Sequence, residues 1–290
     1  MIIGFAGLGV MGGPMAGHLV AAGHEVRGFN RSADKARAWA ERTGGQYAET
    51  IAAAAEGVEL FILCVGNDDD VRQVVTEALP NLAPKAIVVD HTTTSAKVAR
   101  EMADLAAGQG RTFIDAPVSG GEAGAVNGQL TIMAGGDAAA WARVEPVLDV
   151  YAKASRLMGP SGAGQLTKMA NQICIAGAVQ GVAEALHFAQ SAGLDETAVY
   201  EAISKGSAQS WQMDNRWATM ARGEFAFGFA VDWMRKDLGL VLDEARRNGS
   251  HLALTALVDQ FYSEVQAMGG ARWDTSSLAA RLQARKPARP

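Results

Sequence analysis

A lysine and two side-chain amides are the residues of this sequence best suited to proton chemistry. Lys168, Asn171 and Gln172 stand at i, i+3 and i+4 near the start of residues 161–190, and in a helix these positions share one face. A lysine beside two amides suits the handling of an oxygen atom that gains or loses a proton. On this stretch alone the competing interpretation is a solvated lysine at a helix start, because structural charges greatly outnumber catalytic ones.

Residues 161–190 predict the long, buried helix that positions this group. Apolar side chains recur along it at spacings of three and four: Leu166, Met169, Ile173, Val179, Val182 and Leu186. Small residues fill its middle and no proline interrupts it. Thirty helical residues span roughly 45 Å, so we expect this helix to run from one domain into another.

A glycine loop opens the chain. Residues 1–6 predict a strand, an amphipathic helix follows, and between them stands the loop Gly7-Leu8-Gly9-Val10-Met11-Gly12. In that order the glycines let the backbone approach a pyrophosphate, and the helix N-terminus offers N–H groups and a positive dipole. Residues 24–30 predict the second strand of a βαβ unit, so the sequence predicts a dinucleotide-binding loop.

The end of that second strand bears on which dinucleotide binds. A carboxylate there would bond the ribose 2′-hydroxyl of NAD, whereas an arginine accommodates the 2′-phosphate of NADP. The sequence places Asn30, Arg31 and Ser32 at this point and no acidic residue. Arg31 therefore favours NADP, and the alternative is that Arg31 is an exposed loop residue.

The ends of two later strands predict further parts of the same dinucleotide-binding site. Strands over 60–65 and 86–90 would place Val65, Gly66 and Asn67, and residues 92–94, where ligands of parallel sheets bind. We interpret Gly66, Asn67 and the three aspartates at 68–70 as capping a helix that begins near Val71. We interpret His91 as a structural donor rather than an acid.

Ser119, Gly120 and Gly121 follow a strand over 112–115 and predict a carboxylate cradle made of a hydroxyl and two backbone N–H groups. Residue 117 is proline, so Ser119 does not fit the nucleophile motif of hydrolases. Strand and helix alternate until a strand over 154–158, and residues 195–204, 211–221, 231–248 and 253–268 then predict helices only. We therefore expect a nucleotide-binding α/β domain over 1–160 and an all-helical domain over 161–290.

Composition excludes other classes of protein. The 290 residues carry a net charge of −5, and the only basic cluster is the tail 281–289, where prolines predict a frayed end, so nucleic acid is not an expected partner. Cys64 and Cys174 lie in apolar runs and predict packed thiols in a reducing cytoplasm. We expect no membrane span and no metal site, because no apolar run is long enough and no His/Cys spacing fits a metal.

Four motifs in order make the sequence resemble the β-hydroxyacid dehydrogenase family, which includes 3-hydroxyisobutyrate dehydrogenase and several semialdehyde reductases. They are the glycine loop with Gly13-Pro14-Met15, then Asp115-Ala-Pro-Val-Ser119-Gly120-Gly121, Gly162-Ala-Gly164-Gln-Leu-Thr-Lys168-Met-Ala-Asn171, and Lys236-Asp237-Leu-Gly239. The resemblance covers the chain nearly end to end. It departs from the family at Gln172, where many members carry asparagine, so which amide touches the substrate is open.

The resemblance implies a Rossmann domain joined by the long helix to an all-α domain. It also implies that Lys168 is the general acid/base, that Ser119, Gly120 and Gly121 hold a substrate carboxylate, and that Thr93 and Lys236 reach the cofactor. On spacing alone Lys236 and Asp237 form a solvated helix face. Relatives are commonly dimers or tetramers, so we expect a homodimer or homotetramer.

The leading hypothesis is therefore an NADP-preferring enzyme that interconverts small 3-hydroxy acids and their semialdehydes or keto acids. One alternative is an imine or other C=N reductase on the same scaffold, against which Lys168 and the Ser119 cradle argue. The other is a non-catalytic dinucleotide-binding scaffold, which loss of the lysine would have supported. The sequence does not identify the acid.

Overall fold

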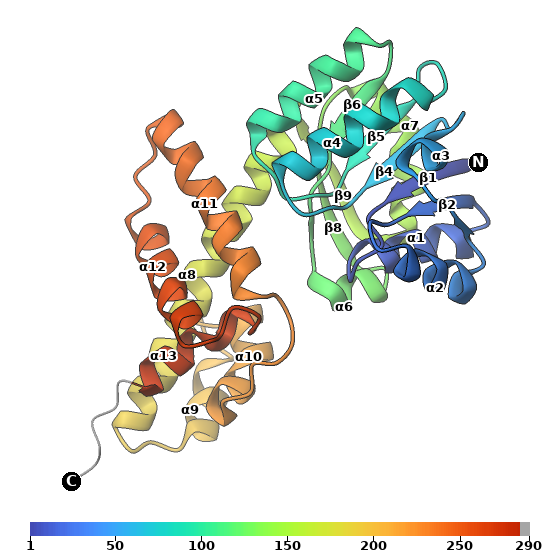
Figure 1. Ribbon diagram of the computed structural model, residues 1–290. Helices are drawn as coiled ribbons and strands as arrows, with labels where there is room; N and C mark the ends of the chain where they lie inside the picture. Colours follow the sequence, from blue (N-terminus) through green and yellow to red (C-terminus); the bar gives the residue numbers. More distant parts are fainter. Residues whose placement is uncertain (285–290) are drawn as a thin grey trace. The chain divides into compact units, whose positions relative to one another are not determined.

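The computed structural model describes residues 1–284, and they divide into two compact units on either side of the Lys168–Met169 bond (Figure 1). Unit 1, up to Lys168, is an α/β unit built on one sheet. Unit 2, from Met169 on, is helical. The long helix α8 (Ala163–Ser191) contributes its first residues to unit 1 and the remainder to unit 2. This confirms the predicted fold class, a Rossmann-type unit followed by an all-α unit.

The sheet of unit 1 follows the order β3-β2-β1-β4-β5-β6-β8-β7, with β9 paired to β8. Its strands are β1 (Ile2–Ala6), β2 (Glu25–Phe29), β3 (Gln46–Tyr47), β4 (Leu60–Leu63), β5 (Ile87–Asp90), β6 (Thr112–Asp115), β7 (Val118–Ser119), β8 (Leu130–Gly135) and β9 (Ala152–Gly159). The six neighbouring strands β3, β2, β1, β4, β5 and β6 all run parallel, whereas β8 runs antiparallel to β6. The carboxyl ends of β1, β4 and β5 therefore meet at one edge, where ligands of open parallel sheets bind.

Helices cover both faces of this sheet. They are α1 (Gly12–Ala21), α2 (Ala33–Thr43), α3 (Ile51–Ala55), α4 (Asp68–Ala78), α5 (Ala96–Gly108), α6 (Gly121–Val126) and α7 (Ala138–Leu148). Alternate residues of the central strands enter two separate cores, because side chains of a strand point to opposite faces. Ile62 packs with α1 and α7, for example, while Phe61 packs with α3 to α5. Burial on both faces explains why these strands read as continuous apolar runs.

Unit 2 packs its helices around the later turns of α8. They are α9 (Glu196–Ile203), α10 (Trp211–Arg222), α11 (Val231–Asn248), α12 (Ala253–Ala267) and α13 (Leu278–Ala284). Its core contains Val179 and Leu186 of α8 together with Trp217, Leu238 and Tyr262. Of the apolar stripe predicted over residues 161–190, Met169, Val179, Val182 and Leu186 are buried, whereas Leu166 and Ile173 are only partly buried.

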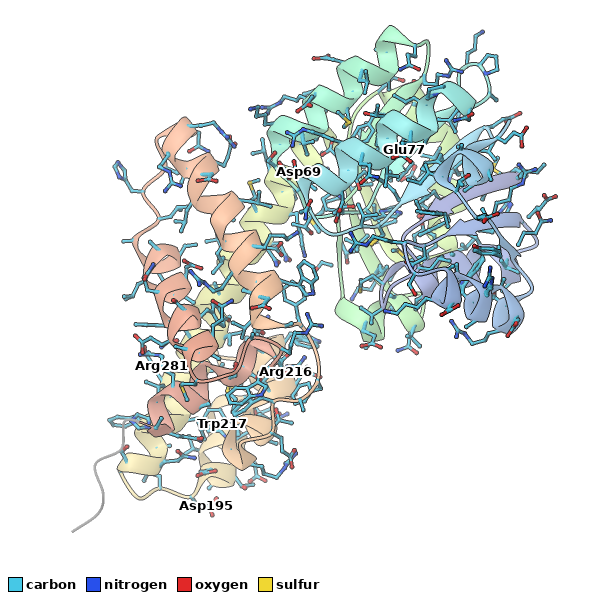
Figure 2. The ribbon with its side chains drawn as sticks, in the orientation of Figure 1. Asp69, Glu77, Asp195, Arg216, Trp217 and Arg281 are labelled. Atoms are coloured by element: carbon cyan, nitrogen blue, oxygen red, sulfur yellow. The ribbon has the colours of Figure 1, made fainter. Side chains whose placement is uncertain are left out.

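A buried carboxylate closes unit 2. Asp274, 1% exposed, accepts hydrogen bonds from Arg216 Nε at 3.0 Å and from the backbone N–H groups of Phe229 and Ser276 at 2.9 and 3.0 Å. Arg216 comes from α10, as Figure 2 shows. The aspartate thus ties the segment before α11 to the segment before α13.

Several sequence predictions were wrong in detail. The pattern missed the short elements β3, β7, α6 and α13. Arg281, assigned to a basic tail, lies in α13 and is labelled in Figure 2. Its side chain is buried and lies against Phe261 and Glu264. Cys174, predicted to be packed, is exposed on α8, and no disulfide joins it to Cys64. The frayed end predicted around Pro287 and Pro290 lies outside the described residues.

Candidate active site

The glycine loop between β1 and α1 is shaped for a ligand that must come close to the backbone. Gly7 has a φ of +96°, and a Cβ there would overlap the carbonyl oxygen of Cys64. A Cβ at Gly12 would overlap the carbonyl oxygen of Gly7. At Gly9 a Cβ would meet nothing within 4 Å, so the loop is open on that side. No side chain caps the N-terminus of α1, whose N–H groups can therefore bind an anion.

Asn30 holds this loop in place from the end of β2. Its Oδ1 accepts a hydrogen bond from the backbone N–H of Leu8 at 3.0 Å, and its Nδ2 donates to the carbonyl oxygen of Ser32 at 3.2 Å. Arg31, the next residue, has a side chain that is 91% exposed, with Nη1 3.6 Å from Asp70 Oδ1. An exposed pair at that distance is weak, so the guanidinium can leave Asp70 for a phosphate.

The ends of β4 and β5 form the next part of this edge. The backbone N–H of Val65 donates to Thr92 Oγ1 at 3.0 Å, and that of Gly66 donates to Asp70 Oδ2 at 3.2 Å. Asn67 is the N-cap of α4, and its Oδ1 accepts from the N–H of Asp70 at 2.9 Å. The helix thus begins at Asp68 and not near Val71, because an asparagine one residue before the aspartates caps it.

The aspartates form the first turn of α4 instead of its cap. Asp68 accepts hydrogen bonds from the backbone N–H of Ser95 at 2.9 Å and from Ser95 Oγ at 2.5 Å, which links the start of α4 to the start of α5. Thr93 alone among residues 91–95 is partly exposed, whereas its neighbours are buried. Thr93 is thus accessible at this edge, and its contact with a nicotinamide nucleotide stays a prediction.

The predicted cradle lies on the antiparallel side of the sheet. Ser119 ends β7 and pairs with Thr131 of β8, and Gly120 and Gly121 follow with φ of +133° and +62°. Only glycine adopts such angles readily. His18 of α1 contacts the far end of α6 through Nε2, 3.0 Å from the carbonyl oxygen of Ala125. The cradle therefore has a fixed position relative to the helix that follows the glycine loop.

His91 is a buried structural group. Its Nδ1 lies 2.6 Å from the carbonyl oxygen of Ala116 and its Nε2 2.8 Å from the hydroxyl of Tyr151. A carbonyl only accepts, so Nδ1 carries the proton and Nε2 accepts from Tyr151. Burial lowers the pKa of His91 to about 4, against the opposing effect of the bond to Ala116. The imidazole is therefore neutral at pH 7, as the sequence interpretation of a structural donor requires.

Two residues that the motif analysis left without a role organise the start of α8. Asp115, at the end of β6, accepts from the N–H of Gly162 at 2.7 Å and from that of Gln165 at 2.9 Å. Gln165 is fully buried, and its Nε2 donates to the carbonyl oxygen of Thr92 at 2.8 Å while its Oε1 accepts from the N–H of Thr94 at 3.0 Å. Desolvation raises the pKa of Asp115 to about 6, against the backbone N–H groups that favour its charge.

Lys168 stands one turn after Gln165 on α8 and is 7% exposed. It is therefore not the solvated lysine of the alternative interpretation, because burying a charged group needs partners or a function. The signal for Gln165 was available in the sequence, since it lies three residues before Lys168 and so shares its face of the helix.

The remaining predicted residues belong to unit 2. Asn171 Nδ2 donates to Gln172 Oε1 at 2.8 Å, and Gln172 Nε2 donates to Asp237 Oδ2 at 2.7 Å. Lys236 Nζ lies 3.2 Å from Asp237 Oδ1. Asp237 is 2% exposed, so the prediction of a solvated face was wrong for it. Its charge is tolerated on the buried side of α11 because Lys236 and Gln172 both bond it.

Within residues 1–284, no cluster of three or more histidine, cysteine, aspartate or glutamate side chains is arranged to hold a metal ion. The same part of the chain has no helix that is both long and apolar enough to cross a bilayer.

Comparison with known proteins identifies two families along the chain. Residues 2–173 match the NAD binding domain of 6-phosphogluconate dehydrogenase. Residues 162–282 match the family described as NAD-binding of NADP-dependent 3-hydroxyisobutyrate dehydrogenase. The two matches overlap in the first turns of α8.

Full-length relatives agree with these matches. An uncharacterized oxidoreductase of Shewanella frigidimarina is 62% identical, over 97% of this chain and 98% of that protein. The 2-hydroxy-3-oxopropionate reductase of Escherichia coli is 35% identical over 98% of this chain and 97% of its own. Among solved structures, 3-hydroxyisobutyrate dehydrogenase of Mycobacterium tuberculosis with L-serine has a TM-score of 0.90 at 31% identity, covering 98% of this chain and 99% of that one.

Proposed function

This chain belongs to the β-hydroxyacid dehydrogenase family and is an NAD(P)-dependent dehydrogenase or reductase, and from that premise we propose that it interconverts small 3-hydroxy acids and their semialdehydes or keto acids. The observation that carries the proposal is the burial of Lys168 on a helix whose start is bonded to the strand that leads into Ser119. The helix that carries the proton donor is thus bonded to the strand after which the carboxylate cradle follows.

In the proposed reaction the residues of the chain have three roles: they bind the cofactor, orient the substrate and transfer a proton. The glycine loop binds the dinucleotide, whose nicotinamide supplies or accepts the hydride. Ser119 and the N–H groups of Gly120 and Gly121 hold the substrate carboxylate, which fixes the orientation of the carbonyl two bonds away. Lys168 gives its ammonium proton to the carbonyl oxygen as that oxygen gains charge, and regains a proton from solvent.

The amides have separate tasks in this proposal. Gln172 is engaged at both ends, by Asn171 and by Asp237, so we assign it to orienting Asn171. Asn171 donates to the reacting oxygen and stabilises its charge. Lys236, paired with Asp237, reaches the cofactor.

Removal of Lys168 tests the mechanism. We expect Lys168→Ala to lower kcat by ~10²–10⁴-fold, the usual cost of losing a general acid/base, while NADPH binding changes little. Steady-state kinetics and fluorescence titration of NADPH measure the two quantities. Lys153→Ala, which removes an exposed lysine of β9, is the matched control. Turnover by Lys168→Ala within a few-fold of the parent would remove Lys168 from the mechanism.

A substrate panel tests the reaction. Semialdehydes, keto acids and 3-hydroxy acids of three to five carbons are assayed with both cofactors by absorbance of the reduced nicotinamide. We expect turnover to require the carboxylate, because the cradle has no other task. Faster reduction of an uncharged imine than of every carboxylated carbonyl would favour the alternative C=N reductase.

We further propose that NADP is the preferred cofactor, supported by an arginine, Arg31, just after β2 and by the absence of a carboxylate at residue 30. Charged hydrogen bonds of a guanidinium to phosphate contribute roughly 1.5–3 kcal/mol, or on the order of 10–100-fold in affinity. Arg31→Ala should weaken NADPH by that factor and leave NADH unchanged. Arg42→Ala, which removes an exposed arginine from the other end of α2, should change neither. A parent enzyme that prefers NADH would overturn the proposal.

The placement of functions along the chain is also proposed. We assign cofactor binding to residues 1–160, substrate closure and dimerisation to residues 161–290, and a reducing cytoplasm as the compartment. The two family matches, to residues 2–173 and 162–282, support a division of the chain near this point. The two cysteines, neither of which is in a disulfide, support the reducing compartment.

A further inference from the structure

We propose that Gln165 is a positioning residue for proton transfer, because its side chain fastens the first turns of α8 to the loop of residues 92–94 and so fixes where Lys168 stands relative to Thr93. The inference rests on the proposed role of Lys168 as proton donor. It deepens that proposal by naming the group that sets the position of the ammonium.

The amide of Gln165 makes a two-ended bond to this loop. Nε2 donates to the carbonyl oxygen of Thr92 at 2.8 Å, and Oε1 accepts from the N–H of Thr94 at 3.0 Å. These two backbone groups flank Thr93, so the glutamine holds the loop on both sides of the residue expected at the nicotinamide. With Gln165 fully buried, water does not substitute readily for either bond.

The backbone of the same residue is held by a strand. Asp115 Oδ2 accepts from the N–H of Gln165 at 2.9 Å, and Oδ1 accepts from that of Gly162 at 2.7 Å. A helix start normally finds its cap in a neighbouring side chain of its own segment. Here the cap comes from β6, and its negative charge also complements the helix dipole. The first turn of α8 is thereby joined to the sheet as well as to the loop.

Two glycines make this junction too close for adjustment. A Cβ at Gly164 would stand 2.7 Å from the carbonyl oxygen of Asp115 and 2.8 Å from its Oδ2. A Cβ at Gly135 would stand 2.7 Å from Asp115 Oδ1 and 2.7 Å from the backbone N of Gly164. There is no room for a methyl group on either side of the carboxylate. The helix can therefore neither slide nor rotate here without losing contacts.

The position of Lys168 is set by this first turn of α8. It lies three residues after Gln165, about 4.5 Å further along the axis and on the same face. Both side chains are buried in unit 1. The helix start stays held by Asp115, so loss of the Gln165 side-chain bonds frees the loop of residues 92–94 to move away from the helix. That movement changes the distance between the ammonium and a carbonyl held beside Thr93. A misplacement of about 1 Å in such a geometry costs on the order of 10²-fold in rate.

A double-mutant cycle tests the inference. We expect Gln165→Ala to lower kcat by ~10–100-fold and to change the dissociation constant of NADPH by less than about threefold. In the Lys168→Ala background the same substitution should lower kcat no further than about twofold, because a residue that acts through Lys168 has nothing to position once the lysine is gone. Gln180→Ala, which removes another buried glutamine of α8 bonded only to Glu184 within the helix, is the control and should keep the parent kcat.

The outcomes separate the two proposals. If Lys168→Ala retains turnover, the role of Lys168 fails; if Lys168→Ala is impaired and Gln165→Ala is additive with it, only the positioning role fails. Where Gln165→Ala does not fold, Gln165→Glu keeps the shape and the acceptor for Thr94 but turns a second oxygen toward the carbonyl of Thr92. Its kcat relative to the parent should rise as the pH falls and that carboxyl gains a proton to donate. A ratio that does not change with pH would overturn the inference.

Discussion

The buried His91 should lower the stability of unit 1 as the pH falls, and the substitution His91→Gln should remove this pH dependence. Its pKa is about 4 in the folded protein and 6.5 for an ordinary histidine. The unfolded chain therefore binds more protons between pH 6.5 and 4, so the free energy of unfolding falls as the pH falls through this window. A difference of 2.5 pH units corresponds to about 3.4 kcal/mol, of which roughly 2 kcal/mol is lost by pH 5.

The perturbation is His91→Gln, which can still donate to the carbonyl of Ala116 or accept from Tyr151 but does not titrate. Asp115 acts with the opposite sign, because its pKa of about 6 lies above the ordinary 3.8 and the folded protein binds the extra proton. Asp115 stabilises the fold as the pH falls from 6 towards 4 and is present in both proteins. Its contribution therefore cancels when the variant is subtracted from the parent.

The urea dependence of amide hydrogen exchange in β5, measured at pH 7 and pH 5, reports on unfolding of the unit that contains His91. We expect the parent to be more stable than the variant at pH 7, and that advantage to shrink by roughly 2 kcal/mol at pH 5. An advantage that changes by less than about 0.5 kcal/mol would show that the imidazole titrates normally, and the reasoning from burial would be refuted.

Three further results are expected. Gly12→Ala should weaken NADPH binding at least tenfold by fluorescence titration, because its Cβ would overlap the carbonyl of Gly7, whereas Gly17→Ala on the same helix meets only a methyl group at 3.5 Å and should not. Asp274→Ala should lower the free energy of unfolding of unit 2, measured in urea, by ~3–5 kcal/mol, because Arg216 loses its buried ion-pair partner. A loss below about 1 kcal/mol would contradict this. Light scattering should give a dimer or tetramer at micromolar concentration, and a monomer of about 30.3 kDa would refute the predicted assembly.

The sequence pattern was enough to predict those helices and strands whose bounds depend on neighbouring residues in the chain. The boundaries of β6 and α11 were predicted to the residue, because capping and periodicity are local signals. The short strands β3 and β7 could not be predicted in this way, since two residues carry no period and form only when a partner strand lies beside them.

Hydrogen bonds between residues far apart in the sequence could not be predicted from the sequence pattern. Spacing assigned Asp237 to a solvated face, yet the helix places it in unit 2 beside Gln172, 65 residues earlier. The sequence analysis considered Asn30 only as the position where a carboxylate would bond the ribose of NAD. In the structure its side chain accepts a hydrogen bond from the N–H of Leu8 in the glycine loop. Such pairs leave no mark in periodicity because each partner looks like an ordinary polar residue in its own segment.

The sequence by itself determined the two fold classes, the order of the longer elements, the glycine loop and the candidate lysine, because these follow from local sterics, periodicity and motif order. Only the tertiary structure decided that Asp115 caps α8 from another strand, that Gln165 bonds the loop around Thr93 and that His91 is neutral. Each of these depends on which groups meet after the chain has folded and on how much water is excluded around them. Burial and partner identity are properties of the packed chain, and they set the position and charge of groups whose mere presence the sequence had already shown.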